Sequence, residues 1–241
     1  MAEPRNMTVV AVHGAWADGS SWRDVILDLQ REGIRVIAAP IPLTSLGDDA
    51  AALKRTIART DGPVIVAGHA YAGAVIATAN DERVKALVYI AALAPDEGET
   101  VAQVFYRDEK HPHSPQLAPD ADGLIWMPDE GFPNAFSQHA TAEQIAWSTA
   151  VQRPISVKCI QEPVAKPAWR SKPSWFLIAE EDRMINPKTQ HFMAQRMGAT
   201  IRSLAVDHTP LLSAPRQVVD IILEAAGAVS AQTEKIRKEA S

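Results

Sequence analysis

Short apolar runs alternate with amphipathic stretches along the first 92 residues of the chain. Four such runs occur, at residues 8–12, 35–39, 63–67 and 84–92. Unbroken apolar runs of this length are typical of strands buried on both faces of a parallel sheet. The segments between them carry apolar residues at helical spacing, as in residues 22–29. The pattern predicts an α/β fold with a doubly wound, mainly parallel sheet.

The same alternation resumes near residue 174, with apolar runs at 175–179 and 200–206 and helical patterns after Pro187 and Val218. The intervening segment holds ten of the 17 prolines and three of the six tryptophans, and it contains no convincing strand. One helix is expected from about Thr141, which opens a capping-box sequence. A long irregular insertion inside a compact domain usually forms a lid or binding loop.

These patterns predict one domain with an inserted cap. We expect residues 1–94 and 174–230 to form the core, residues 95–173 to form the cap, and residues 231–241 to form a charged, solvated tail. The final helix is expected to end near Ser230, and Asp48 or Asp49 is expected to open the second helix.

Composition narrows the function classes. The 241 residues are 46% hydrophobic and carry a formal net charge of -5 without a basic stripe, which argues against a nucleic-acid partner. No apolar run approaches the roughly 20 residues that span a bilayer, and residues 1–6 lack the apolar core of a signal peptide. The single cysteine, Cys159, excludes an internal disulfide and fits a reducing compartment. We expect a cytoplasmic protein without a membrane partner, either a monomer or a homodimer.

Residues 64–76 read as a buried strand, a sharp turn and a helix of small residues. The turn, Gly68-His69-Ala70-Tyr71-Ala72-Gly73, has the form of a nucleophile elbow, in which a serine normally stands at the tip between small residues. Here the tip residue is Ala70, which carries no nucleophile.

The other groups that acyl transfer needs follow the ends of other predicted strands. Asp182 is the candidate acid, and His208 is the candidate base. The backbone N–H groups of Ala15 and Tyr71 are the candidate oxyanion donors. The carboxyl ends of parallel strands face one crevice. Along the chain the nucleophile position comes first, then the acid and then the histidine, which is the order found in α/β folds that carry a nucleophile elbow.

Each candidate also has a structural interpretation. Asp182 could cap the helix that starts near Pro187, and Asp96 is a second possible acid because it also follows a strand. Asp207 is expected to be a turn residue. His13 and His69 are expected to support their turns. Three further residues are set aside. His111 and His113 lack a nearby third metal ligand, and Cys159 is expected to be a buried small hydrophobe rather than a nucleophile.

The chain resembles the serine-dependent α/β-hydrolase family in four places. They are His13-Gly14-Ala15-Trp16, the turn from Gly68 to Gly73, Asp182 with Arg183 and Pro187, and His208. The first is similar to plant methyl esterases and hydroxynitrile lyases. The segment from Ser174 to Pro187 is similar to small bacterial esterase-like proteins. The resemblance implies an α/β-hydrolase fold and hydrolysis of a small-molecule carboxylic ester by Ser-His-Asp acyl transfer. It implies no metal and no cofactor.

Ala70 departs from the pattern of that family, which requires serine at this position. We interpret it as a Ser→Ala change in an otherwise complete ester hydrolase, which leaves this chain catalytically impaired. Two alternatives stay open: a natural pseudoenzyme or ligand-binding protein, or a cofactor-free lyase or oxygenase that uses His208 as its base. For the substrate pocket, the aromatic side chains expected to contact an acyl or aromatic ester are Trp16, Tyr71, Trp126 and Trp147.

Overall fold

Six parallel strands form the central sheet in a computed structural model that describes residues 7–239. Their spatial order is β2-β1-β3-β4-β7-β8. The bounds are β1 Thr8–Val12, β2 Arg35–Ala39, β3 Val64–His69, β4 Val84–Ile90, β7 Ser174–Ala179 and β8 Thr200–Leu204. Each neighbouring pair is parallel. The predicted doubly wound parallel sheet is therefore confirmed.

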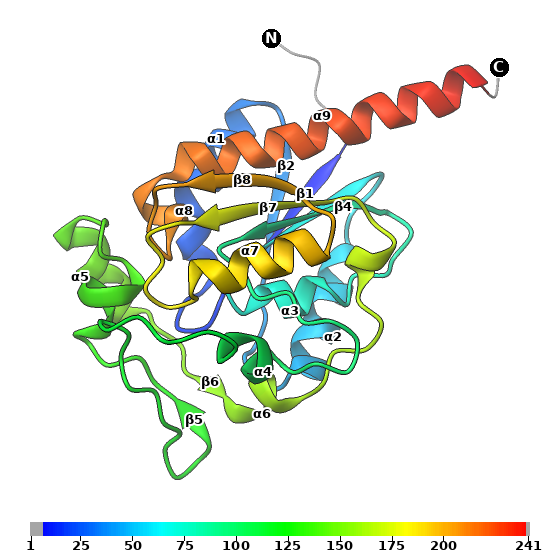
Figure 1. The fold of residues 1–241 in the computed structure, drawn as a ribbon. Coiled ribbons are helices and arrows are strands. Elements are labelled where there is room, and N and C mark those ends of the chain that lie inside the picture. Colours follow the sequence, from blue (N-terminus) through cyan, green and yellow to red (C-terminus); the bar gives the residue numbers. More distant parts are fainter. Residues whose placement is uncertain (1–6, 240–241) are drawn as a thin grey trace.

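Helices cover both faces of this sheet (Figure 1). Helices α1 (Arg23–Arg31) and α9 (Pro215–Glu239) lie on one face. Helices α2 (Leu46–Ile57), α3 (Ala72–Ile76) and α7 (Pro187–Arg196) lie on the other. Successive side chains of a strand point to opposite faces, and each interior strand must therefore be apolar on both. This requirement explains the unbroken apolar runs seen in the sequence.

Two separate apolar clusters show this alternation in β1. Val9 packs with the buried residues of α1 and α9, whereas Val10 packs with those of α2 and α3. The edge strands β2 and β8 are only partly buried. The sheet therefore has one core on each face, and its central strands are shielded from solvent.

The start of the second helix differs from expectation. Ser45, rather than Asp48 or Asp49, caps α2 by accepting a hydrogen bond from the Asp48 N–H group. The first helix is preceded by a 3-10 turn, Gly19–Trp22, whose cap is Asp18. Several Ser and Asp residues close together can each serve as a cap, and only the path of the chain selects one.

The chain ends in a longer helix than the pattern indicates. Helix α9 continues through Glu239, beyond Ser230, so most of the segment expected to form a solvated tail is helical. In Figure 1 this part of α9 extends past the sheet. Residues 1–6 and 240–241, which include the segment judged for a signal peptide and the end of the tail, lie outside the described residues.

The insertion between β4 and β7, residues 95–173, is folded into short elements. They are α4 Val101–Phe105, β5 Leu124–Ile125, a π-helical turn Phe132–Phe136, α5 Ala142–Ala150, β6 Ile155–Ser156, α6 Val157–Gln161 and a 3-10 turn Ala168–Arg170. A further short helix, α8 Pro210–Ser213, lies outside the insertion, after β8. The capping box of Thr141 with Gln144 is present at the start of α5. The expectation of no strand here is wrong, because β5 and β6 pair antiparallel. Two-residue strands leave too short a pattern to detect.

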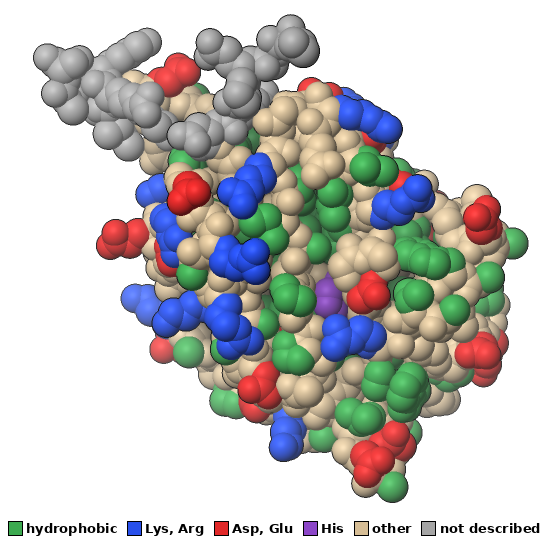
Figure 2. Space-filling view, turned by 180° about the vertical axis from the view of Figure 1, so that it is seen from behind, with side chains coloured by type: hydrophobic (Ala, Val, Ile, Leu, Met, Phe, Trp, Pro, Cys, Tyr) green, Lys and Arg blue, Asp and Glu red, His purple; other side chains and the backbone are tan. Residues whose placement is uncertain are grey.

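The surface carries charges of both signs. On the face shown in Figure 2, basic and acidic side chains both occur among hydrophobic ones. No helix in the described part of the chain is long and apolar enough to cross a membrane. The division of the chain into core, cap and tail stays a prediction.

Candidate active site

Ala70 stands at the tip of a sharp turn between β3 and α3. Its φ is 52°, in the left-handed region that residues other than glycine rarely adopt. The turn is tight because its neighbours are small. A Cβ atom at Gly73 would lie 2.1 Å from the Leu93 carbonyl oxygen, and one at Gly68 would lie 2.9 Å from the carbonyl oxygen of Ala72. This backbone has the strained strand-turn-helix form of a nucleophile elbow.

Two backbone N–H groups beside this tip donate to no group among the described residues. They belong to Ala15, after β1, and to Tyr71, which follows Ala70. The N–H of Trp16, by contrast, donates to the Arg153 carbonyl oxygen at 3.1 Å. The turn after β1 packs directly on the elbow, since a Cβ at Gly14 would lie 3.0 Å from that of Ala70. Free N–H donors at this place are what an oxyanion would require.

His208 and Asp182 form a buried pair after β8 and β7. The distance from His208 Nδ1 to Asp182 Oδ2 is 2.8 Å, and both residues are 2% exposed. The other carboxylate oxygen, Oδ1, accepts the N–H groups of Met184 at 2.7 Å and Ile185 at 2.9 Å. Because a carboxylate only accepts hydrogen bonds, Nδ1 carries the proton of neutral His208 and Nε2 is left as an acceptor.

Gln190 of α7 contacts the same carboxylate oxygen as His208. Its Nε2 atom donates to Asp182 Oδ2 at 2.7 Å and to the Ile185 carbonyl at 3.0 Å, while its Oε1 atom accepts from the Ala179 N–H group. The side chain is fully buried. Sequence reasoning missed Gln190. A polar residue on the buried side of a helix that starts at Pro187 was the available signal.

Two further histidines lie in the turns around the site, and His69 is the one that contacts His208. Nε2 of His69 lies 2.7 Å from the His208 carbonyl oxygen, and the two rings are 5.0 Å apart. Burial, with the nearby His208, lowers the pKa of His69 to about 3. His69 is therefore neutral and donates this bond. His13 places Nδ1 2.9 Å from the Gly14 carbonyl oxygen, and burial lowers its pKa as well.

An apolar cavity of about 60 Å³ adjoins Ala70 and His208. Its walls come from the elbow, the turn after β1, the insertion and the loop after Asp182. The lining residues are Ala15, Trp16, Ala70, Tyr71, Leu93, Val101, Ala102, Phe105, Tyr106, Leu117, Ile125, Phe136, Ile155, Ile160, Met184, Ile185 and His208. Trp16 uses its ring N–H on the Ile125 carbonyl at 2.9 Å. The other polar side chains of the wall are those of His208, Tyr71 and Tyr106.

Of the four aromatic residues expected at the substrate, Trp16 and Tyr71 line this cavity and the other two do not. Trp126 is 48% exposed, and its ring N–H lies 3.3 Å from Asp120 Oδ2. Its neighbour Ile125 faces the cavity, and successive side chains of an extended segment point to opposite sides. Trp147 lines a separate cavity of about 20 Å³, behind Trp16 and Phe136.

The alternative candidates have other partners. Asp96 pairs with Arg170 at 2.7 Å, away from His208. Asp207 is buried, but it accepts hydrogen bonds from the His139 N–H group and the Ser213 hydroxyl. Burial raises the pKa of Cys159 to about 12, which suppresses its thiolate. The described residues contain no cluster of three His, Cys, Asp or Glu suited to a metal ion.

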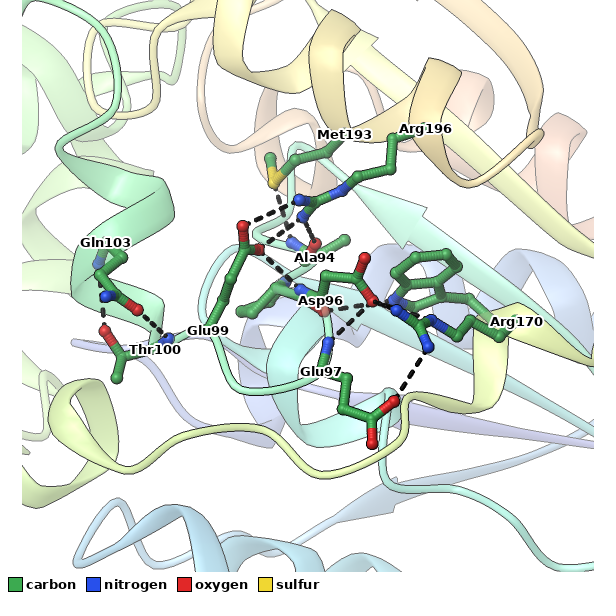
Figure 3. Close-up of polar contacts among 11 residues, drawn as sticks. Ala94, Asp96, Glu97, Glu99, Thr100, Gln103, Arg170, Met193 and Arg196 are labelled. Atoms are coloured by element: carbon green, nitrogen blue, oxygen red, sulfur yellow. Dashed lines mark hydrogen bonds and ion pairs between the residues drawn. The ribbon is translucent and has the colours of Figure 1, made fainter.

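A polar network anchors the part of the insertion that contributes α4 to the cavity wall (Figure 3). Arg196 of α7 holds both carboxylate oxygens of Glu99, at 3.0 and 2.8 Å, and donates to the Ala94 carbonyl. Burial, the largest single influence, would raise the pKa of Glu99, but the hydrogen bonds from Arg196 and the Asp96 N–H group together with the charge of Arg196 outweigh it, and the pKa is lowered. Thr100, the next residue, caps α4. Helix α7 therefore contacts both Asp182 and the base of the insertion.

Known proteins with similar sequence cover nearly the whole chain. Norfluorocurarine synthase 2 of Strychnos sp. is 22% identical in an alignment 250 positions long, gaps included; the alignment covers 89% of this chain and 93% of that protein. Among solved structures, a pyrethroid hydrolase from Sphingobium faniae JZ-2 superposes with a TM-score of 0.79 and 20% identity, covering 92% of this chain and 98% of that one. Polyneuridine aldehyde esterase gives 0.75 and 17%, covering 90% and 98%.

These structural likenesses bear on the fold. Together with the six-stranded parallel sheet and the flanking helices, they confirm the predicted α/β-hydrolase fold. A family model described as the alpha/beta hydrolase family matches residues 9–221, which include the elbow, Asp182 and His208. The chain belongs to the alpha/beta hydrolase family.

Proposed function

We propose that this site is built for carboxylic-ester hydrolysis by acyl transfer, with position 70 as the place of the nucleophile. With Ala70 the chain binds an ester but forms no acyl-enzyme. The observation that carries the proposal is the strained φ of 52° at Ala70, between the unpaired N–H groups of Ala15 and Tyr71. His208 lines the same cavity, and Asp182 is hydrogen-bonded to it from behind the wall. A turn of this kind is costly to maintain.

The reaction with serine at position 70 follows from these contacts. His208 Nε2 takes the serine proton as the hydroxyl oxygen attacks the ester carbonyl, and Asp182 holds the imidazole in the required tautomer. The N–H groups of Ala15 and Tyr71 stabilise the oxyanion. His208 then protonates the leaving alcohol, and a water molecule repeats the sequence to release the acid. Alanine offers no oxygen for the first step.

The cavity wall indicates the substrate class. No Lys, Arg, Asp or Glu side chain is among its lining residues. An ionised group would lose its hydration there without gaining a partner, which is strongly unfavourable. We therefore propose an uncharged ester with an apolar acyl or aryl group. The names of two structural relatives, a pyrethroid hydrolase and a polyneuridine aldehyde esterase, support a hydrolytic function.

A second candidate function rests on the His208–Asp182 pair, which is intact although position 70 carries no nucleophile. No Ser, Thr or Cys lines the cavity, yet His208 keeps its acid partner and an acceptor nitrogen. His208 could then act as a general base on a bound substrate or water molecule, as in a cofactor-free lyase.

The test compares the Ala70 chain with the Ala70→Ser variant on p-nitrophenyl butyrate. We expect the variant to release nitrophenol in a burst followed by turnover, at least about 10³-fold faster than the Ala70 chain. It should also react covalently with an aryl organophosphonate. A folded Ala70→Ser protein that forms no adduct and shows no turnover would overturn the proposal.

The control adds His208→Ala to both backgrounds. In the Ala70→Ser background this change should abolish the burst, because the serine loses its base. In the Ala70 background, a residual reaction that depends on His208 would favour the second candidate function, whereas a residual reaction that does not depend on it would argue against that candidate.

A further inference from the structure

Asp49 is a fully buried carboxylic acid of α2 that the reaction described above does not use. Its oxygens accept hydrogen bonds from three separate segments. Tyr71 donates its hydroxyl at 2.7 Å, the Leu43 N–H group donates at 2.7 Å, and the Cys159 thiol lies 3.7 Å away. Among the described residues, no Lys, Arg or His forms an ion pair with it.

A buried carboxylate without a cation is expensive to maintain. Removal from water disfavours its charged form, and burial raises the pKa of Asp49 although the donors act in the opposite direction. An apolar side chain of similar volume would fill the same space without this penalty. The carboxylate therefore needs another explanation, and the three segments that carry its donors indicate one.

Tyr71 is the donor closest to the reaction. It follows Ala70, its side chain lines the cavity, and its backbone N–H group has no partner among the described residues. The phenol is buried, and the bond to Asp49 is the hydrogen bond that its hydroxyl makes. A ring fixed at its hydroxyl end has little freedom to turn, and this constrains the backbone that carries it.

The other donors connect Asp49 to the rest of the cavity wall. Cys159 belongs to α6 of the insertion, and the next residue, Ile160, lines the cavity. Leu43 has a φ of 62° and accepts the Ser156 N–H group through its carbonyl. Asp49 therefore joins the elbow, the loop before α2 and the insertion at one point.

We propose that Asp49 is a positioning residue, which holds Tyr71 so that its backbone N–H group and its ring face the cavity. The catalytic part of this role rests on the function proposed above. The geometric part does not, because it concerns the Ala70 chain as it is.

The first experiment therefore uses the Ala70 chain and needs no turnover. The backbone amide signal of Tyr71 is followed by ¹H-¹⁵N NMR while methyl phenylacetate, an uncharged ester, is added. We expect a shift of this signal in the Ala70 chain, and a loss of that shift in Tyr71→Phe and Asp49→Asn. Tyr71→Phe removes only the hydroxyl. It therefore decides the matter if Asp49→Asn does not fold.

The second experiment places the same changes in the Ala70→Ser background. Loss of a positioned oxyanion donor should lower kcat about tenfold with less than a twofold change in KM. The double variant should be no worse than either single one, because both changes break one contact. The matched control is Asp48→Asn, an exposed neighbour on the same helix, which should leave kcat unchanged.

The outcomes separate the two proposals. If Ala70→Ser is inactive but the Tyr71 amide shift is lost in Asp49→Asn, the proposed function fails and the positioning role stands. If Asp49→Asn and Tyr71→Phe both fold, keep the Tyr71 amide shift and keep kcat, Asp49 is only structural and the inference is overturned.

Discussion

At the scale of single residues, the candidate site depends on polar groups that are buried and hydrogen-bonded. Asp182 is held by Gln190 and by two backbone N–H groups as well as by His208. Buried polar groups of this kind hold the side chains around them in one arrangement when all their hydrogen-bond partners are present. Removing a single partner leaves the others unsatisfied, so each such residue has a large effect on its neighbours.

The lowered pKa of His69 gives a prediction for stability against pH. The folded state holds this ring neutral down to about pH 3, whereas an unfolded chain protonates it near 6.5. The unfolded state therefore binds more protons below pH 6.5, and the contribution of His69 is present above this pH and lost as pH falls. We expect protonation of His69 in the unfolded chain to lower the free energy of unfolding by about 1–2 kcal/mol between pH 6.5 and pH 5.

Urea unfolding at several pH values checks this in the Ala70 chain and in His69→Gln, whose side-chain amide can still donate to the His208 carbonyl. The variant should show a shallower decline of unfolding free energy over this range. His13, whose pKa burial also lowers, remains in both proteins as a common background. Equal slopes in the two proteins would contradict the assignment.

At the scale of elements, the sequence predicts the strands better than the helix starts. Central strands such as β3 are buried on both faces, so their apolar runs are unmistakable. Helix α2 begins at a cap that several neighbouring residues could supply. The strands β5 and β6 have two residues each, too few for a period. Their pairing depends on contacts between distant segments.

Helix α7 links Asp182 to the base of the insertion, and Arg196 is the residue to test. Arg196→Met keeps much of the aliphatic stem but removes the bidentate contact with Glu99. The Arg196 side chain is 17% exposed and that of Glu99 is 35% exposed, so solvent weakens the pair. We expect the unfolding free energy to fall by about 1–2 kcal/mol, with weaker binding of an uncharged ester at the wall that α4 forms.

The matched control is Arg170→Met. This residue makes the neighbouring but more exposed ion pairs with Asp96 and Glu97. In denaturant unfolding, the free energy of unfolding should change by less than about 0.5 kcal/mol in this variant. Equal losses in the two variants would show that Arg196 has no special place at the base of the insertion.

At the scale of the whole molecule, the cavity is formed jointly by the core and the insertion. Tyr71 and Met184 come from loops of the core, whereas Phe105 and Ile160 come from the insertion. A ligand in this cavity contacts both parts and binds only the folded chain. Binding therefore stabilises the protein as a unit.

Thermal unfolding of the Ala70 chain with methyl phenylacetate tests this property. At a ligand concentration of 100 times Kd, the stabilisation is about 2.7 kcal/mol, which raises Tm by about 5–10 °C for a chain of this size. Phenylacetate has the same skeleton with a negative charge, and we expect it to leave Tm unchanged. An equal rise with both ligands would contradict an apolar site without a cation.

The amino-acid pattern is sufficient to predict the sheet and the order of the candidate residues along it. Apolar runs mark the central strands, and the carboxyl ends of parallel strands meet at one edge. That rule is sufficient to bring the segments that carry Ala70, Asp182 and His208 to one side of the sheet. It needs only local pattern and chain order.

Tertiary structure alone decided which side chains meet there. The pairing of Asp49 with Tyr71, the contact of Gln190 with Asp182 and the outward direction of Trp126 follow from how elements pack. These contacts join residues far apart in the chain or on facing surfaces. Their geometry is set by side-chain direction and close packing, which a one-dimensional pattern does not contain.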